Sequence, residues 1–197
     1  MFEAVNRALF IWLSPPSDLS GAALFWLRAL AQWPVFALPL LLAMLWLVGS
    51  TEDREAAVLA AVSGCVALLV AHVASTIVVH PRPFMDGLQQ NFLDHVRDSS
   101  FPSDHATLFF GLTGSFLLRP ALLVPRLWTG LAIGGIAVGL ARVALGAHYP
   151  FDVLGAIAIG LIAAAIVVET PVAVLAAALA SLGERFRSLA TSSTRSR

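Results

Sequence analysis

Hydrophobic residues occur along this chain in long blocks that are separated by short polar segments. A bilayer core needs roughly 20 apolar residues per helix. We therefore predict five membrane-spanning helices, at about 33–48, 56–79, 103–118, 127–145 and 151–168. Pro171 interrupts the pattern, and the Ala-rich stretch 172–182 is either a sixth, marginal span or a helix on the membrane surface. The pattern predicts an all-α membrane bundle that forms one domain over residues 1–190.

Two shorter helices are predicted before the first span. Apolar residues repeat at helical spacing over 2–13, while Glu3 and Arg7 lie on another face. This arrangement is typical of an amphipathic helix that lies in the membrane interface. A second surface helix is expected at 19–31. At the other end of the chain, the Ser/Thr/Arg-rich tail 191–197 is predicted to be disordered and cytoplasmic.

Composition supports a membrane protein. The chain of 197 residues is 58% hydrophobic and 12% charged, with a mean hydropathy of +0.84. Soluble domains carry about 25% charged residues. The formal net charge is zero, so the basic surface of a nucleic-acid-binding protein is not expected. Cys65 is the single cysteine, which excludes an intramolecular disulfide.

The distribution of arginine predicts the orientation of the spans. With five spans, the turn at 119–126 and the C-terminal tail lie on one side, and both are rich in arginine. Cytoplasmic loops carry an excess of basic residues. The loop at 80–104 and the turn at 141–152 are therefore expected at the outer face.

Three polar clusters fall at that outer face. They are "HPRPF" (80–84), "SFPSDHA" (100–106) and "ARVALGAHYPFD" (141–152). Ionisable groups at the ends of spans are costly and are usually functional. Because helix packing can bring these segments together, we expect one site built from all three.

The clusters offer groups that bind an anion. Pro102 is expected in the first turn of a helix, which leaves the amides from Ser103 onward without partners. Such a helix N-terminus favours phosphate. Arg82 and Arg142 add planar, permanently charged groups that suit phosphate oxygens. A phosphate site is therefore predicted.

The same clusters offer catalytic groups. His105 and His148 can exchange protons or attack phosphorus. Asp152 follows His148 by four residues, and on a helix that begins at Pro150 it can reach back to fix the imidazole tautomer. The predicted chemistry is phosphoryl transfer through histidine. The outer-loop carboxylates fit no recognised metal cage, so no metal site is predicted.

These motifs resemble a known family. Arg82-Pro83, "FPSDH" and Arg142-x5-His148-x3-Asp152 resemble the signature blocks of the type 2 phosphatidic acid phosphatase superfamily. Those blocks read Lys-x6-Arg-Pro, Pro-Ser-Gly-His and Ser-Arg-x5-His-x3-Asp, and the match covers about 75–155. Within the superfamily, "PRPF" and "SFPSDHA" look like the bacterial undecaprenyl-diphosphate phosphatases of the bacitracin-resistance type.

The resemblance implies a role for each site residue. His148 would form a phosphohistidine, Asp152 would hold it, and His105 would protonate the leaving oxygen and then activate water. Phosphate would be bound by Arg82, Ser103 and Arg142. The resemblance implies no metal and no other cofactor.

The resemblance also implies a substrate and a location. The expected activity is hydrolysis of undecaprenyl diphosphate to the monophosphate at the outer face of the bacterial plasma membrane, which recycles the lipid carrier of cell-wall synthesis. Two alternatives stay open. One is a phosphatase for phosphatidylglycerophosphate or phosphatidic acid, and the other is a non-catalytic lipid-phosphate binder or transporter.

The sequence departs from the family pattern at three positions. Ser75 stands where the first block has Lys, Asp104 replaces the Gly of the second block, and Ala141 replaces the Ser of the third. We expect Asp104 to modulate the site by holding Arg82 or Arg97 in the absence of the Lys.

Each motif also has a plain structural interpretation. "PSDH" is a helix cap, the two arginines are interfacial anchors, and His148 with Asp152 ties a turn. The joint spacing favours the functional interpretation. His72 is expected to pack against another helix, and His80, His95 and Arg97 are expected to be solvated loop residues.

Overall fold

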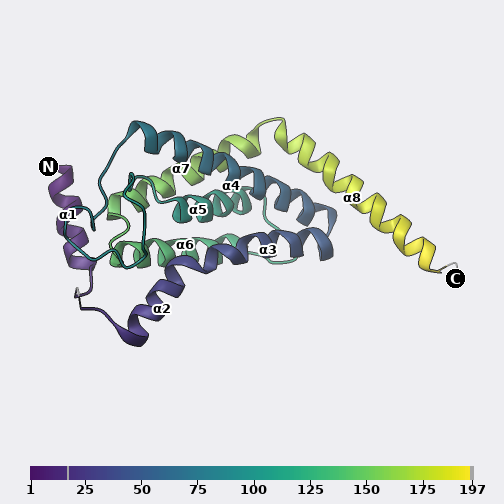
Figure 1. Cartoon of the computed structure of the whole chain (residues 1–197). Coiled ribbons are helices and arrows are strands. Elements are labelled where there is room, and N and C mark those ends of the chain that lie inside the picture. Colours follow the sequence, from purple (N-terminus) through teal and green to yellow (C-terminus); the bar gives the residue numbers. More distant parts are fainter. Residues whose placement is uncertain (17, 196–197) are drawn as a thin grey trace.

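The computed structural model describes residues 1–16 and 18–195, and it confirms the all-helical prediction (Figure 1). Eight helices and no strand occur in these ranges. The helices are α1 (Phe2–Leu13), α2 (Gly21–Gln32), α3 (Pro34–Val48), α4 (Thr51–Ile77), α5 (Asp104–Leu118), α6 (Leu127–Ala144), α7 (Pro150–Glu169) and α8 (Val172–Arg195).

Helix α5 forms the centre of the bundle, and α4, α6 and α7 pack around it. Its residues from Phe109 to Phe116 are all buried. Glycines let the helices approach closely at the core. A Cβ added to Gly160 of α7 would lie 2.7 Å from the backbone nitrogen of Gly111 in α5. The tight contact between α5 and α7 holds together the two helices that start at the predicted site.

Three helices are long and apolar enough to cross a membrane, namely α4, α6 and α7. The pair α2 and α3, which bends by 40° at its break, could form a fourth span. Helix α5 has only 15 residues, or roughly 22 Å at about 1.5 Å per residue. It is short for a span, but the surrounding helices shelter it from lipid. By length and composition the described residues thus contain three to four candidate spans, and the five or six that the hydrophobic blocks predict stay a prediction.

Helix α4 begins at Thr51, five residues before the predicted start of this span. A capping box explains the difference. The Ser50 hydroxyl accepts from the Asp53 amide at 3.2 Å, and the Asp53 carboxylate accepts from the Ser50 amide at 2.9 Å. The charged turn is therefore part of the helix. Asp53 also accepts from the amides of Leu122 and Leu123, which ties this end of α4 to the turn between α5 and α6.

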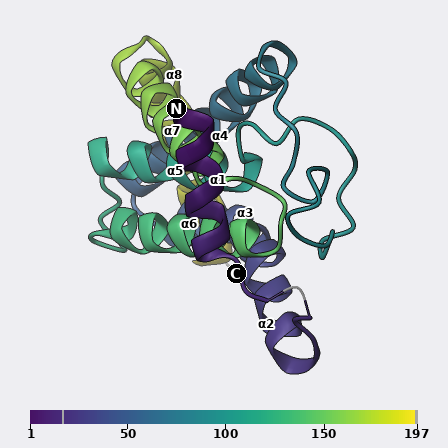
Figure 2. The same ribbon diagram turned by 90° about the vertical axis from the view of Figure 1, so that its left-hand side faces the viewer.

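Helix α1 crosses the opposite end of the bundle, as Figure 2 shows. Its amphipathic pattern predicted this helix, and it spans Phe2–Leu13. The second predicted surface helix is α2. At the C-terminus, α8 follows Pro171 and continues through Arg195. The disorder expected for 191–197 stays a prediction, and 196–197 lie outside the described residues.

Candidate active site

The three polar clusters lie together at the end of the bundle that α1 crosses (Figures 1 and 2). Backbone hydrogen bonds join them. The Ser100 amide donates to the His80 carbonyl at 2.8 Å, and the Phe84 amide donates to the Gly146 carbonyl at 3.3 Å. Gly146 has a φ of +77°, a conformation that favours glycine in the turn between α6 and α7. The predicted convergence of the three segments is present in the structure.

His148 lies in that turn and is almost fully buried, with 2% of its surface exposed. Its Nδ1 lies 2.7 Å from the Ser100 carbonyl oxygen. A carbonyl only accepts, so Nδ1 carries the proton and Nε2 keeps its lone pair. Nε2 is buried and has no hydrogen-bond partner in the described part of the chain. An imidazole nitrogen with an unshared lone pair has the chemistry of a nucleophile.

Asp152 lies in the first turn of α7, which begins at Pro150 as predicted. Its Oδ2 accepts from the Tyr149 amide at 2.7 Å and lies 3.9 Å from Nδ1 of His148. The direct partner of that Nδ1 is the Ser100 carbonyl rather than the carboxylate we expected. Asp152 still lies close enough to stabilise positive charge on the imidazole ring.

Arg82 is buried beside a carboxylate of the outer loop. Its Nε and Nη2 each lie 2.8 Å from Oδ1 of Asp98, and its Nη1 donates to the Ala147 carbonyl at 2.8 Å. We predicted that Asp104 would hold Arg82 or Arg97. The predicted contact between Asp104 and Arg82 is wrong, because the carboxylate that contacts the Arg82 guanidinium is that of Asp98. A modulating role for Asp104 stays a prediction.

Arg142 projects from the last turn of α6 and is also buried. Its Nη2 lies 2.8 Å from Nε2 of His95, and its Nη1 donates to the Ala31 carbonyl at 3.4 Å. A guanidinium only donates, so Nε2 of His95 accepts and its Nδ1 carries the proton. The His95 ring lies 6.3 Å from the His148 ring, between centroids. His95 is therefore a site residue and not the solvated loop residue that we expected.

Ser103 is the N-cap of α5, so Pro102 precedes the helix and does not lie in its first turn as predicted. The Ser103 amide donates to the Asp152 carbonyl at 3.4 Å and is not free. Its hydroxyl is buried and unpaired within the described residues. The amides of the next residues open the helix, where no intrahelical acceptor is available. An anion at this helix end would find the hydroxyl and these amides.

Two cavities are lined by residues of the three clusters and of the loop between α4 and α5. The first, of about 590 Å³, is called here the α2–α3 cavity, and Trp33, Phe36, His95, His105 and Arg142 contribute to its wall. The second, of about 560 Å³, is called the α4 cavity, and its wall includes His72, Ser75, Arg82, Asp98 and Asp104. His72 is exposed to this cavity and is not packed against another helix as expected. The predicted acid, His105, therefore faces an open space beside Arg142.

The charges at the site favour a neutral His148. Burial and the nearby guanidinium groups of Arg142 and Arg82 lower the pKa of His148 well below its usual range. The same causes lower the pKa of His95 to about 4. Both imidazoles are thus neutral at neutral pH, next to two permanent cations. A phosphate would meet positive charge and an unprotonated Nε2 at this site.

Sequence reasoning missed three residues that complete the site. Asp98 contacts Arg82, His95 contacts Arg142, and His80 lies 3.4 Å from Asp152 through its Nδ1. All three come from the irregular segment between α4 and α5. His80 belongs to the "HPRPF" block, and its position two residues before Arg82 was the one available signal in the sequence.

Comparisons with known proteins agree with this geometry. Residues 56–175 match the profile of the PAP2 superfamily. The chain is 34% identical over 157 residues to the "Putative undecaprenyl-diphosphatase YbjG" of Escherichia coli (strain K12), covering 79% of this chain and 77% of that protein. It is 31% identical over 126 residues to the undecaprenyl-diphosphatase BcrC of Bacillus subtilis (strain 168), covering 64% and 63% of the two chains.

A shorter match and a solved structure extend the comparison. A lipid A 1-phosphatase of Rhizobium etli is 41% identical over 63 residues, which is 32% of this chain and 25% of that protein. The crystal structure of Aquifex aeolicus LpxE superposes with a TM-score of 0.63 at 20% identity, covering 84% of this chain and 96% of the other, and so shares the fold. The extent of the profile match and of the YbjG match settles the family, and the chain belongs to the PAP2 superfamily, as its three motifs predicted.

Proposed function

We propose that this protein is a membrane lipid phosphatase that hydrolyses undecaprenyl diphosphate through a phosphohistidine on His148. The observation that carries the proposal is a group of buried polar atoms that lack partners within the described residues. They are Nε2 of His148, Nδ1 of His95, Nε of Arg142 and Oγ of Ser103. Buried polar atoms are normally paired. A phosphate group would supply acceptors for the donors and an electrophile for Nε2.

The first step forms a covalent bond to the enzyme. Nε2 of His148 attacks the terminal phosphorus, and the bond from that phosphorus to the bridging oxygen breaks. His105 gives its proton to the leaving oxygen, which departs as undecaprenyl phosphate. Positive charge grows on the His148 ring, where Asp152 opposes it. Negative charge on the transferring group is balanced by Arg82 and Arg142.

The second step releases phosphate. His105, now neutral, takes a proton from water, and the water oxygen attacks the phosphorus. The bond between phosphorus and Nε2 then breaks, which restores neutral His148 and frees inorganic phosphate. The two steps use only side chains of this protein and water, so the proposal includes no metal and no organic cofactor.

The names of the relatives support the substrate class. Two relatives that match most of this chain are named as undecaprenyl-diphosphatases, one of them provisionally. The apolar wall that Trp33 and Phe36 give to the α2–α3 cavity suits an isoprenoid tail. The shorter match to lipid A 1-phosphatases makes a glycolipid phosphate the second candidate substrate.

We propose further that α3 to α7 form five spans, with the site at the outer face of the bacterial inner membrane. The arginine-rich turn between α5 and α6 lies at the opposite end of the bundle from the site, which supports a cytoplasmic position for that turn. The exposed apolar residues of α1 support its place in the interface, where they would contact lipid. An enzyme in this position would recycle the lipid carrier of cell-wall synthesis.

A substrate panel tests the proposal. The purified full-length protein, in detergent, is offered undecaprenyl diphosphate, phosphatidylglycerophosphate, phosphatidic acid and lipid A, with inorganic phosphate as the readout. The proposal predicts the highest kcat/KM for undecaprenyl diphosphate. A higher kcat/KM for another lipid would change the proposed substrate but leave the proposed phosphatase reaction in place. Binding without phosphate release for every lipid would favour a binder or transporter and overturn the proposal.

A further inference from the structure

The carboxylate of Asp152 has a second neighbour on the side away from His148. Its Oδ1 lies 3.4 Å from Nδ1 of His80, while its Oδ2 accepts from the Tyr149 amide. Asp152 is buried, with 2% of its surface exposed. A buried carboxylate that lost a cationic neighbour would be costly to keep ionised. The residue at position 80 is therefore part of the immediate surroundings of this buried carboxylate.

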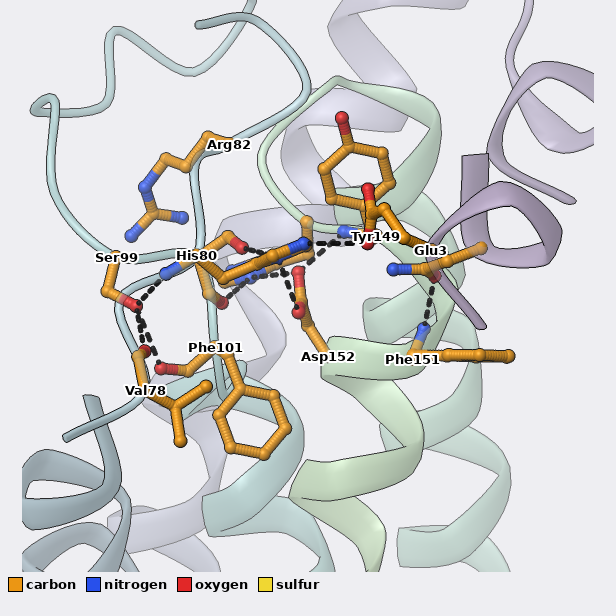
Figure 3. A network of polar contacts seen from close by, with 12 residues as sticks. Glu3, Val78, His80, Arg82, Ser99, Phe101, Tyr149, Phe151 and Asp152 are labelled. Atoms are coloured by element: carbon orange, nitrogen blue, oxygen red, sulfur yellow. Dashed lines mark hydrogen bonds and ion pairs between the residues drawn. The ribbon is translucent and has the colours of Figure 1, made fainter. Parts of the chain in front are cut away.

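His80 bridges two acidic residues, as Figure 3 shows. Its Nε2 lies 3.2 Å from Oε2 of Glu3, on the opposite side of the ring from Asp152. Carboxylates only accept, so both ring nitrogens of His80 are best satisfied when both carry protons. The hydrogen bond with Asp152 is the main cause that raises the pKa of His80, and Glu3 adds to it. His80 thus lies between two acidic side chains that favour its protonated form.

Ser100 gives His80 a second connection to His148. The Ser100 hydroxyl lies 2.8 Å from Nδ1 of His80, and the Ser100 carbonyl accepts from Nδ1 of His148. Both groups near Nδ1 of His148, the Ser100 carbonyl and the Asp152 carboxylate, therefore belong to residues that contact His80. A change at His80 would reach the proposed nucleophile by two short routes.

The other end of the bridge belongs to α1. This helix is attached to the site region by three further contacts: the Phe151 amide donates to Asn6, Arg7 pairs with Asp86 at 2.6 Å, and the Phe10 ring meets the Tyr149 ring edge-on. Its outward side chains are apolar and exposed, among them Phe2, Ile11 and Trp12. One face of α1 thus suits the membrane interface, and the other carries Glu3 to His80.

We propose that His80 is a positioning residue for the reaction, a link that joins Glu3 of the interfacial helix α1 to Asp152 and keeps that carboxylate oriented toward His148. The inference rests on the proposed function, in which His148 becomes positively charged as the bond to phosphorus forms. His80 does not touch the substrate in this account. It acts through Asp152, so its loss should lower kcat more than it changes KM.

The charge of His80 gives the inference a pH dependence. The groups that face its ring are Asp152 of α7, Glu3 of α1 with Arg7 paired behind it, Tyr149 of the turn, and Ser100 of the loop. The pKa of His80 is raised from about 6.5. Its support for Asp152 is therefore complete below that value and is lost as the pH rises through the raised pKa. The alkaline side of the kcat profile should contain this loss.

A double-mutant cycle tests the inference. The variants His80→Gln, Asp152→Asn and their combination are purified as full-length proteins, and kcat and KM for undecaprenyl diphosphate are measured across pH. We expect His80→Gln to lower kcat by about tenfold, with KM within about twofold. In the Asp152→Asn background, the same change should lower kcat by less than about twofold. His80→Gln should also lose the alkaline decline that titration of His80 causes.

Two further variants define the control and the link to α1. Glu3→Gln should lower kcat in the same direction as His80→Gln, by about two- to fivefold, because it removes one anion from the bridge. Glu169→Gln, at the far end of α7, is the matched control and should leave kcat unchanged. Size-exclusion profiles and melting temperatures in detergent check that each variant folds.

The outcomes separate the inference from the proposed function. The link would be overturned if His80→Gln kept the wild-type kcat. It would also be overturned if the fold-loss in kcat of the double variant equalled the product of the two single losses. Either result would leave the phosphatase proposal in place. Full activity in Asp152→Asn would overturn both the role of Asp152 in the reaction and the link that acts through it. Absence of turnover in the wild type would remove the proposed function and the inference with it.

Discussion

At the scale of single residues, the environment of Arg82 shows how loop and motif interact. Asp98 contacts two nitrogens of its guanidinium, the same donors that a phosphate would use. Arg82 is only 4% exposed and is also held by the Ala147 carbonyl, so its position does not depend on Asp98. If Arg82 binds phosphate as proposed, the carboxylate of Asp98 competes with the anion for these donors.

This reasoning predicts the effect of neutralising Asp98. Asp98→Asn should lower KM for undecaprenyl diphosphate by up to about fivefold, the factor that corresponds to about 1 kcal/mol for a half-exposed ion pair. Steady-state kinetics check it, and Asp18→Asn, an exposed carboxylate in the segment between α1 and α2, is the control. A higher KM in Asp98→Asn would show that Asp98 positions Arg82 instead.

Asp104 gives a second prediction at this scale. The residue is exposed in the first turn of α5 and lines the α4 cavity beside Arg82. The helix dipole favours an anion there by about 0.3–1 kcal/mol. If this is its whole role, Asp104→Gly should lower the melting temperature slightly and leave KM within about twofold. A several-fold rise in KM would restore a functional role in phosphate binding.

The motifs predicted which segments converge at the candidate site because their spacing encodes a local geometry. The interval from His148 to Asp152 fits one helical turn, and the structure places His148 in the turn just before α7 and Asp152 in the first turn of that helix. Asp98 and His95 could not be predicted in the same way. They lie in an irregular segment without periodicity, and their contacts depend on how that segment folds over Arg82 and Arg142.

At the scale of elements, the contact between α5 and α7 explains why the site is held firmly. The helices approach so closely at Gly160 that an added Cβ would lie 2.8 Å from the Cβ of Phe110. Neither backbone can yield without disturbing the core. Because His105 and Asp152 stand at the N-terminal ends of these two helices, their separation depends on this packing.

This contact predicts a loss of stability. Gly160→Ala should lower the free energy of unfolding by about 1–3 kcal/mol through overpacking. Gly130→Ala in α6 is the matched control, because an added Cβ there meets nothing within 4 Å. The control should be neutral or should stabilise by up to about 1 kcal/mol. Thermal unfolding in detergent distinguishes them, and equal melting temperatures for the two variants would contradict the packing argument.

Helix positions followed well from the hydrophobic blocks, whereas helix ends did not. Ser50 and Asp53 form a capping box that extends α4 into a charged turn. The central position of α5 could not be predicted from its length. Its 15 residues suggest a marginal span, whereas their burial shows that the helix forms the core. Hydrophobicity alone does not tell a residue that faces lipid from one that faces protein.

At the scale of the whole molecule, two buried arginines and a helix end would carry the charge of the substrate. No group of three or more His, Cys, Asp or Glu side chains that could hold a metal ion occurs in the described ranges. We expect EDTA to leave kcat within about twofold, because the anion is balanced by Arg82 and Arg142. Phosphate release with and without chelator checks this, and activity that returns only with Mg²⁺ would contradict it.

The central claim is that His148 carries the phosphoryl group. The most direct measurement uses undecaprenyl diphosphate labelled at its terminal phosphate, with turnover quenched in base, where phosphohistidine survives. The account predicts a label on the wild-type protein that is stable in base and lost in acid, and it predicts no label and no turnover for His148→Ala. Full turnover by His148→Ala, or a label that stays on that variant, would contradict the account.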